Sequence, residues 1–304
     1  MTDQQLQQEI RTALEVVDPE SFDAAREAER RIDFLASYLR ESGLRGYVLG
    51  ISGGVDSTAA GRLAQLAVER VRETGGDARF VGIRLPYREQ QDEADARAAV
   101  EFIGADEILT VDIGPATDAL WDELERAGIG GDAESAHYHR GNVKARERMV
   151  SQFAVAGVRG MAVLGTDQAA EALVGFYTKY GDGAADLVPL FGLPKRRVRD
   201  ITRWLGAPDA LVDKVPTADL ESDRPMLADE EALGVTYAAI DDYLEGREVS
   251  EEDERTIVGW YRRTAHKRAL PITPHGFLGG RPGDRDAAAQ EVIAESPEAQ
   301  GPSA

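Results

Sequence analysis

The sequence predicts a doubly wound α/β fold, in which helices cover both faces of a mainly parallel sheet. Apolar runs of strand length alternate with stretches that carry apolar residues at helical spacing, and this alternation is typical of βαβ units. Strands are predicted at residues 47–51, 78–85, 107–113 and 161–165. A glycine-rich turn separates the first strand from the helix that follows it, as expected at a ligand-binding edge of such a sheet.

The helices follow from periodicity and from glycines or prolines at their ends. They are predicted at residues 25–42, 58–71, 89–103, 116–127, 142–156, 168–174, 195–205, 235–245 and 251–264. Residues 1–24 are interpreted as a polar arm, and residues 207–229, rich in proline and charge, as a mobile lid. Residues 281–304 have the composition of a disordered acidic tail, so residues 1–280 are expected to form one domain.

The composition excludes several classes of function. A net charge of −20, from 55 acidic and 35 basic residues, repels nucleic acid and anionic membranes. No apolar run is long enough to span a bilayer, and the start of the chain lacks the features of a signal peptide, so a soluble cytoplasmic protein is expected. The chain has no cysteine, which excludes disulfides, thiolate metal sites and a cysteine nucleophile.

The segment Ser52–Ser57, with sequence SGGVDS, lies between the first strand and its helix. Gly53 and Gly54 permit positive φ and leave the backbone N–H groups open to an anion at the helix N-terminus. Asp56 would repel a phosphate unless a cation such as Mg²⁺ lay between them, so the segment predicts a site for Mg²⁺-bound polyphosphate. It lacks the lysine of a Walker A loop, so positive charge must come from elsewhere. The alternative is an ordinary helix cap after a glycine turn.

Two further segments carry residues that folding alone does not explain. Glu171 lies among small apolar residues, where a carboxylate is costly unless it is paired or bound to a metal. The segment Phe176–Gly183 combines aromatic rings, glycines and Lys179, which suit the stacking of a ring and the binding of an anion. An ordinary surface loop explains these aromatic residues poorly.

Two weaker signals have structural interpretations. Thr166 and Asp167 precede a helix and are expected to cap it. His137 and His139 are interpreted as part of a solvated polar loop, because no thiol and no further histidine accompany them for metal binding.

Taken together, the motifs resemble those of ammonia-dependent NAD synthetases, within the ATP pyrophosphatase group. The resemblance covers about residues 25–275 and is carried by Ser52–Ser57, Arg84–Tyr87, Arg140–Met149, Gly165–Glu171, Phe176–Gly183, Pro216–Leu220 and His266–Lys267. It implies a Rossmann-like fold, a homodimer, and ATP-dependent amidation of deamido-NAD with ammonia. The products would be NAD, AMP and pyrophosphate, formed through an acyl adenylate.

The resemblance also implies roles for individual positions. ATP is expected to contact Gly50, Ile51, Ser52, Gly53, Gly54, Val55, Asp56, Ser57, Arg84, Thr166, Lys195 and Thr217. Deamido-NAD is expected to contact Arg146, Phe176, Lys179, Asp186, His266 and Lys267, with Tyr177 also against its pyridine ring. The resemblance allows His266 and Lys267 to reach the deamido-NAD of a neighbouring subunit. Asp56 and Glu171 are the expected Mg²⁺ ligands and, with Lys195, the catalytic residues. Arg148 is interpreted as a surface ion-pair partner.

Two other functions fit part of this pattern. A related pyrophosphatase-group enzyme would act on a purine nucleotide or on tRNA, although the acidity of the chain disfavours tRNA. A nucleotide-binding module without turnover, like a flavoprotein subunit, is disfavoured by the joint presence of Asp56, Glu171 and Lys195. Without a cysteine nucleophile the chain cannot release ammonia from glutamine in the way that a glutaminase domain does, so ammonia itself is the expected nitrogen donor. Val55 and Gln168 depart from a glutamine and a histidine found in relatives.

Overall fold

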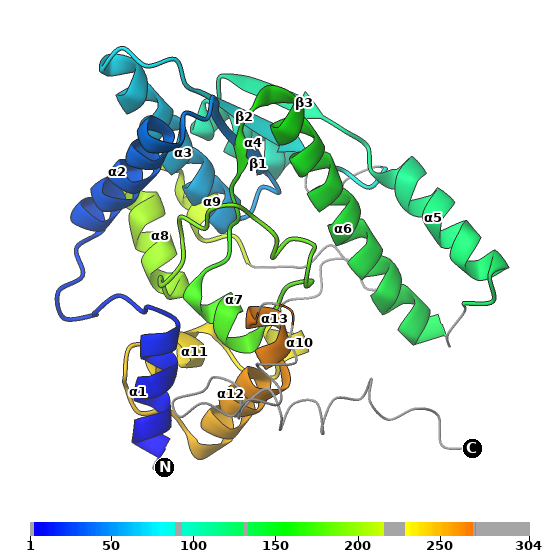
Figure 1. Cartoon of the computed structure of the whole chain (residues 1–304). Coiled ribbons are helices and arrows are strands. Elements are labelled where there is room, and N and C mark those ends of the chain that lie inside the picture. Colours follow the sequence, from blue (N-terminus) through cyan, green and yellow to red (C-terminus); the bar gives the residue numbers. More distant parts are fainter. Residues whose placement is uncertain (1–2, 89–92, 130–132, 216–228, 270, 272–304) are drawn as a thin grey trace.

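A single parallel sheet forms the centre of the protein. The computed structural model describes residues 3–88, 93–129, 133–215, 229–269 and 271. Its strands are β1 (Gly46–Gly50), β2 (Arg79–Arg84), β3 (Glu107–Thr110) and β4 (Ala162–Val163). They pair in parallel in the order β3-β2-β1-β4 (Figure 1). The chain adds β2 and β3 on one side of β1 and then adds β4 on the other side, so the strand order reverses between β1 and β4. This arrangement confirms the predicted fold class.

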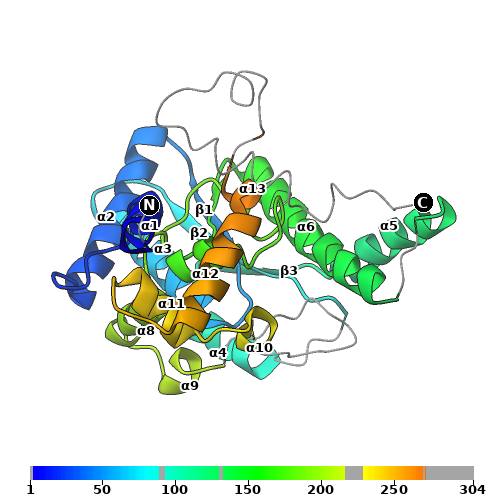
Figure 2. The ribbon, with the colours of Figure 1, turned by 90° about the horizontal axis from the view of Figure 1, so that it is seen from below.

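The helices occupy both faces of the sheet and one end of the molecule (Figures 1 and 2). They are α1 (Asp3–Ala13), α2 (Ala24–Ser42), α3 (Val55–Glu73), α4 (Glu93–Ile103), α5 (Gly114–Arg126), α6 (Ala133–Arg159), α7 (Ala169–Val174), α8 (Lys195–Trp204), α9 (Asp209–Val212), α10 (Asp229–Leu233), α11 (Tyr237–Leu244), α12 (Glu251–Arg263) and α13 (Ala265–Arg268). No helix in the described ranges is long and apolar enough to cross a membrane.

Alternating side chains of the strands divide the core between the two faces of the sheet. Tyr47 and Leu49 are buried in one cluster with residues of α2, α3 and α8. Val48 and Val81 point to the opposite face, where they pack with Ala156 of α6. Because both faces are covered, the strands are apolar almost throughout, as the sequence pattern indicated. Figure 2 shows α5 and α6 side by side, extending away from the other helices.

A third cluster lies at the end of the molecule formed by α1, α7, α11 and α12. No helix was predicted within residues 1–24, but α1 lies there and docks through Ile10. The Nε2 atom of Gln7 also donates to the carbonyl of Tyr243 at 2.9 Å, and Nε of Arg11 donates to the carbonyl of Leu244 at 2.9 Å. These polar contacts anchor α1 to α11. Because α1 docks partly through polar side chains, its sequence shows little apolar periodicity.

The structure corrects three local predictions. His137 and His139 lie within α6, which begins nine residues before the predicted helix, and not in a loop. The cap of α7 is Gln168, whose side chain accepts from the N–H of Ala170 at 2.7 Å, so Thr166 and Asp167 do not cap it. The last predicted helix ends at residue 264, but a further helix, α13, follows it and contains His266.

The predicted lid at residues 207–229 is described only in part. Its first residues form α9, where Leu211 and Val212 are buried against the protein. Residues 216–228, which include Thr217, lie outside the described ranges. The mobility of the lid therefore stays a prediction.

The glycine at the start of β1 provides a test of the sheet geometry. Gly46 has φ +142°, and a Cβ atom added to it would lie 1.8 Å from the carbonyl oxygen of Arg79 on β2. We expect Gly46→Ala to lower the free energy of unfolding by about 3 kcal/mol or more, measured by urea denaturation. Gly43 is the control, because it has φ +69° but nothing within 4 Å, so Gly43→Ala should cost about 1 kcal/mol. Equal losses would contradict the steric argument.

Candidate active site

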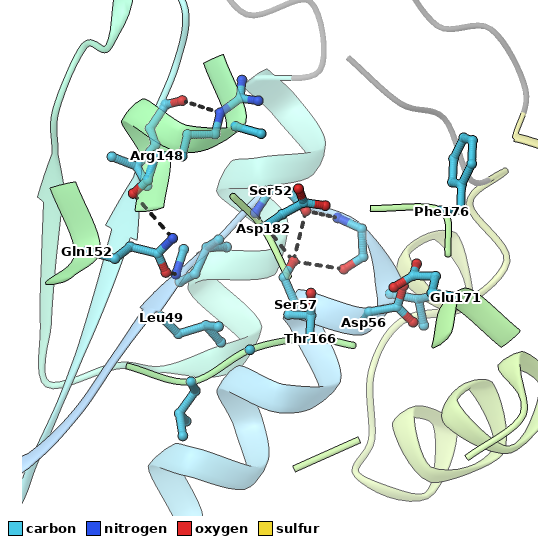
Figure 3. Close-up of a pocket in the computed structure, with 18 of the residues that line it drawn as sticks. Leu49, Ser52, Asp56, Ser57, Arg148, Gln152, Thr166, Glu171, Phe176 and Asp182 are labelled. Carbon is cyan, nitrogen blue, oxygen red and sulfur yellow. Dashed lines mark hydrogen bonds between the residues drawn. The ribbon is translucent and has the colours of Figure 1, made fainter. Parts of the chain in front are cut away.

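A cavity of about 310 Å³ opens at the carboxyl ends of β1 and β4, beside the N-terminus of α3 (Figure 3). In doubly wound sheets, ligands bind where the strand order reverses, and this cavity lies at that position. The predicted site residues that line it are Gly50, Ile51, Ser52, Gly54, Val55, Asp56, Ser57, Thr166, Glu171, Phe176 and Lys195. Residues far apart in sequence thus meet at one place.

The turn into α3 presents backbone donors to the cavity. Gly54 is the N-cap residue of α3 with extended φ and ψ of −82° and 162°, and it has no side-chain cap. Ser57 and Ser52 share a hydrogen bond of 3.1 Å between their hydroxyl groups, which holds the turn closed. Val55 and Asp56 lie in the first turn of α3, so their N–H groups have no carbonyl within the helix to bond. Such a helix N-terminus binds an anion without further rearrangement.

The turn before α3 requires a glycine at position 53 because it packs closely against a neighbouring helix. Gly53 has φ +86°, and a Cβ atom there would lie 2.8 Å from the backbone nitrogen of Ala96 in α4. The turn therefore packs directly against the start of α4. Gly53 does not line the cavity but allows its neighbours to do so.

Two acidic residues and one lysine form the centre of the site. Lys195 Nζ, at the start of α8, lies 2.5 Å from Asp56 Oδ2 and 3.7 Å from Glu171 Oε1. Figure 3 shows the Asp56 and Glu171 side chains next to one another at the edge of the cavity. The side chain of Lys195 is only 3% exposed, so its charge is compensated by these carboxylates and not by water. Asp56 and Glu171, 115 positions apart in sequence, therefore meet at one ammonium group.

Burial and mutual charge shift the proton affinities in this group. Burial raises the pKa of Glu171 well above its usual range, and the negative charge of Asp56 raises it further. Burial lowers the pKa of Lys195, but the charges of Asp56 and Glu171 outweigh this effect and hold it above the ordinary value. Lys195 therefore stays protonated, and additional positive charge at this site would favour the ionised form of Glu171.

The structure does not place every predicted nucleotide contact in the cavity. Arg84 Nη1 donates to Glu93 Oε1 at 2.8 Å, and the described lining of the cavity does not include it. Glu93 belongs to the first turn of α4, so the guanidinium is directed toward that helix. The role of Arg84 in nucleotide binding stays a prediction.

The residues predicted to bind deamido-NAD do not all face the cavity. Phe176 lines the cavity, whereas Lys179 Nζ donates to the carbonyl of His266 at 2.5 Å. Lys267 Nζ donates to the carbonyls of Gly175 and Tyr177 at 2.9 and 2.7 Å. These contacts hold the segment Phe176–Gly183 against α13, so both lysines contribute to the shape of that segment.

The remaining two predicted substrate residues contact the backbone. Arg146 Nη2 donates to the carbonyl of Lys179 at 3.3 Å, from an exposed position on α6. Asp186 Oδ2 accepts from the N–H of Val163 at 2.7 Å and so supports β4. This bond gives Asp186 a structural role that the sequence did not indicate.

Sequence reasoning missed several residues that line the cavity, namely Arg148, Gln152, Asp182, Lys214 and Asp229. The interpretation of Arg148 as a surface residue was wrong, since it lines the cavity and donates through Nε to the carbonyl of Leu85 at 3.1 Å. Gln152 Oε1 accepts from the N–H of Gly50 at 2.7 Å and so fixes the end of β1. Arg148 and Gln152 are four residues apart on α6, and this spacing was the available signal.

Comparison with known proteins identifies the family. A sequence model of NAD synthase matches residues 27–271. The chain belongs to the NAD synthase family. An NH(3)-dependent NAD(+) synthetase of Streptomyces coelicolor is 59% identical over 270 residues, which cover 88% of this chain and 97% of that protein. Membership of the NAD synthase family confirms the resemblance inferred from the motifs.

Solved structures of similar proteins show the same architecture. The NAD+ synthetase of Burkholderia pseudomallei has a TM-score of 0.77 and 53% identity, covering 89% of this chain and 98% of that chain. An NMN synthetase of Francisella tularensis has a TM-score of 0.72 and 32% identity, covering 84% of this chain and 99% of that chain. The NAD synthase fold therefore extends over nearly the whole length of both neighbours.

A buried acid beside the cavity allows a test of the site's electrostatics. Burial, reinforced by the charge of Asp182, raises the pKa of Asp167 to about 7, and its Oδ1 atom is buried without a partner among the described residues. A raised carboxyl pKa stabilises the fold below about pH 4, and this contribution is lost as the pH rises through 7. Asp167→Asn, which cannot ionise, should therefore stabilise the protein at pH 8 by about 2 kcal/mol, with a smaller gain at pH 5.

The measurement is urea denaturation of both proteins at the two pH values. Asp122→Asn, at an exposed position on α5, is the matched control and should show no such pH-dependent gain. A gain for Asp167→Asn that is equal at both pH values would contradict the assigned proton affinity.

Proposed function

We propose that this protein forms NAD from deamido-NAD and ammonia while ATP is converted to AMP and pyrophosphate. The observation that carries the proposal is the contact of Lys195 with both Asp56 and Glu171 beside the open N-terminus of α3. The names of the family and of its 59% identical relative supply the substrate class. The absence of cysteine from the chain favours ammonia over glutamine as the nitrogen donor.

The site suits a triphosphate and Mg²⁺. The N–H groups at the start of α3 and the ammonium of Lys195 provide donors and positive charge for phosphate oxygens. Asp56 Oδ1 is buried without a hydrogen-bond partner among the described residues, and an oxygen atom of this kind is a suitable ligand for a hard cation. Asp56 and Glu171 would hold Mg²⁺, which when bound would neutralise charge on the phosphates.

The chemistry follows from charge development. The carboxylate of the nicotinate ring attacks the α-phosphorus of ATP, the bond to the bridging oxygen breaks, and pyrophosphate leaves with its electron pair. Lys195 and the N–H groups of α3 stabilise the charge that collects on pyrophosphate. Ammonia then attacks the acyl carbon of the adenylate, AMP leaves, and the nitrogen loses one proton to give the amide. No protein nucleophile is required.

The remaining assignments belong to this proposal. Gly50–Ser57, Thr166, Arg84 and Thr217 would contact ATP, and Phe176, with the loop that Lys179 and Lys267 clamp, would contact deamido-NAD. Arg146, Asp186 and His266 complete the expected substrate set. A cytoplasmic location also stays a prediction.

An assay of the purified protein tests the function. With ATP, Mg²⁺ and deamido-NAD, ammonium should support formation of NAD with equal amounts of AMP and pyrophosphate, detected by mass spectrometry, and glutamine should not. Glu171→Gln should lower kcat about 100-fold or more, because it removes one of the two carboxylates expected to hold Mg²⁺. Glu147→Gln on α6 is a matched control outside the described lining of the cavity and should retain activity.

Each other outcome of this assay has a defined meaning. Nicotinate mononucleotide should be a poor acceptor; if it is preferred, the protein instead matches the NMN synthetase named among its neighbours. If ATP yields no pyrophosphate with either acceptor, the proposed function is wrong and a binding module is favoured.

The expected homodimer is also part of the proposal. The helices α5 and α6 extend from the body of the protein, and α6 carries Val150 at 53% exposure and Val158 at 90% exposure (Figure 2). Such side chains favour an interface between subunits. Light scattering after gel filtration should give twice the mass of the chain, and Val150→Asp should shift the protein toward the monomer. Phe34→Asp, on α2 at the opposite face of the sheet, should not; a monomeric wild type would refute the dimer.

A further inference from the structure

The helix that carries Lys195 has no N-terminal cap of its own. The N-cap residue of α8 is Pro194, which has φ −57° and ψ 154° and makes no side-chain cap hydrogen bond. A helix start of this kind leaves backbone N–H groups that require acceptors when they are buried. Lys195 is the first residue of α8, so any movement of this helix start would move the catalytic ammonium directly.

A carboxylate from another helix supplies the missing acceptors. Asp241 of α11 accepts from the N–H of Lys195 through Oδ1 and from the N–H of Arg196 through Oδ2, both at 2.8 Å. Asp241 is 2% exposed, so its ionised form depends on these bonds and on the Arg196 guanidinium, whose Nε lies 3.4 Å away. The start of α8 is therefore fixed by α11, 46 residues later in the chain.

The same face of α11 also contacts the other end of Lys195. Tyr237 precedes Asp241 by four residues, a spacing that places both side chains on one side of the helix. The Nζ atom of Lys195 lies 5.0 Å from the centroid of the Tyr237 ring, a favourable distance for a cation over an aromatic face. Helix α11 thus holds the backbone of Lys195 with Asp241 and its ammonium with Tyr237.

The neighbouring acid on α11 makes no such contacts. Asp242 Oδ1 accepts from Arg196 Nη2 at 2.8 Å and from Arg247 Nη1 at 3.0 Å, and both partners are side chains. Asp242 therefore shares the helix, the charge and one arginine with Asp241 but does not cap α8. A comparison of Asp241 with Asp242 therefore distinguishes the effect of capping the α8 backbone from the effect of negative charge on α11.

We propose that Asp241 is a positioning residue for the reaction, which caps α8 from α11 and so holds the Lys195 ammonium against Asp56 and Glu171. This inference rests on the proposed function. Because a misplaced charge loses transition-state stabilisation, Asp241 should affect kcat more than KM for ATP.

The first experiment compares Asp241→Asn with Asp242→Asn in the steady-state assay for NAD formation. Asparagine keeps the size of the side chain but offers one acceptor where the carboxylate offers two. Asp241→Asn should lower kcat about 10- to 100-fold with a smaller change in KM for ATP, whereas Asp242→Asn should stay within about 3-fold of the wild type. Equal kcat values for folded Asp241→Asn and the wild type would overturn the inference.

A double-mutant cycle distinguishes positioning from a general structural role. Affinity for Mg²⁺-bound ATP is measured by calorimetry for the wild type, Asp241→Asn, Lys195→Ala and the double variant. If Asp241 acts through Lys195, Asp241→Asn weakens binding in the wild type but not in the Lys195→Ala background. Equal losses in both backgrounds would show that Asp241 acts independently of Lys195 and would refute the proposal.

Folding is monitored by circular dichroism at the assay temperature for every variant. Should Asp241→Asn be unfolded there, Asp241→Ser takes its place, because the serine side chain is shorter and has one oxygen atom where the carboxylate has two. A folded serine variant must then show the same loss of kcat, and wild-type kcat would overturn the inference. A wild type that forms no NAD would refute the proposed function alone, while the calorimetric cycle would still test the inference.

Discussion

The compensation of charge around Lys195 is the interaction on which the rest of the site depends. Lys195 is almost fully buried, and a buried ammonium is stable only beside negative charge. Asp56 and Glu171 provide that charge from two different helices, α3 and α7. The ion group therefore links three parts of the chain, and it lies where β1 and β4 direct their carboxyl ends into one cavity.

The surrounding scaffold is arranged to keep this group in place. Gln152 holds the end of β1, and Gly53 lets the turn before α3 pack against α4. Helix α11 supports α8 through Asp241, and α1 in turn supports the end of α11 through Arg11. Hydrogen bonds thus link α1 to α11 and α11 to the start of the helix that carries Lys195, and each bond satisfies a backbone group that would otherwise be costly to bury.

The elements predicted from sequence were those whose side chains alternate or repeat without help from distant residues. The strand at 47–51 and the helices α2, α3 and α12 agree with their predicted ranges to within a few residues. Helix α1 was not predicted, because its docking depends on the polar contacts of Gln7 and Arg11 with α11. The cap of α7 was assigned to Thr166 and Asp167, but Gln168 reaches the N–H of Ala170 from within the buried turn.

The sequence by itself determined the parallel sheet, the glycine turn and the residue types of the site, since these follow from periodicity, backbone freedom and local charge. It also indicated that Asp56 requires a cation, because a carboxylate beside an anion site is unfavourable alone. The family resemblance implied that Asp56, Glu171 and Lys195 act together, and only the tertiary structure decided which atoms of these residues meet. The contacts of Lys195 with Asp56, Glu171 and Asp241 span 139, 24 and 46 positions of the chain. Residues so far apart in sequence come into contact because the helices pack against the sheet, and no local pattern of residues encodes that packing.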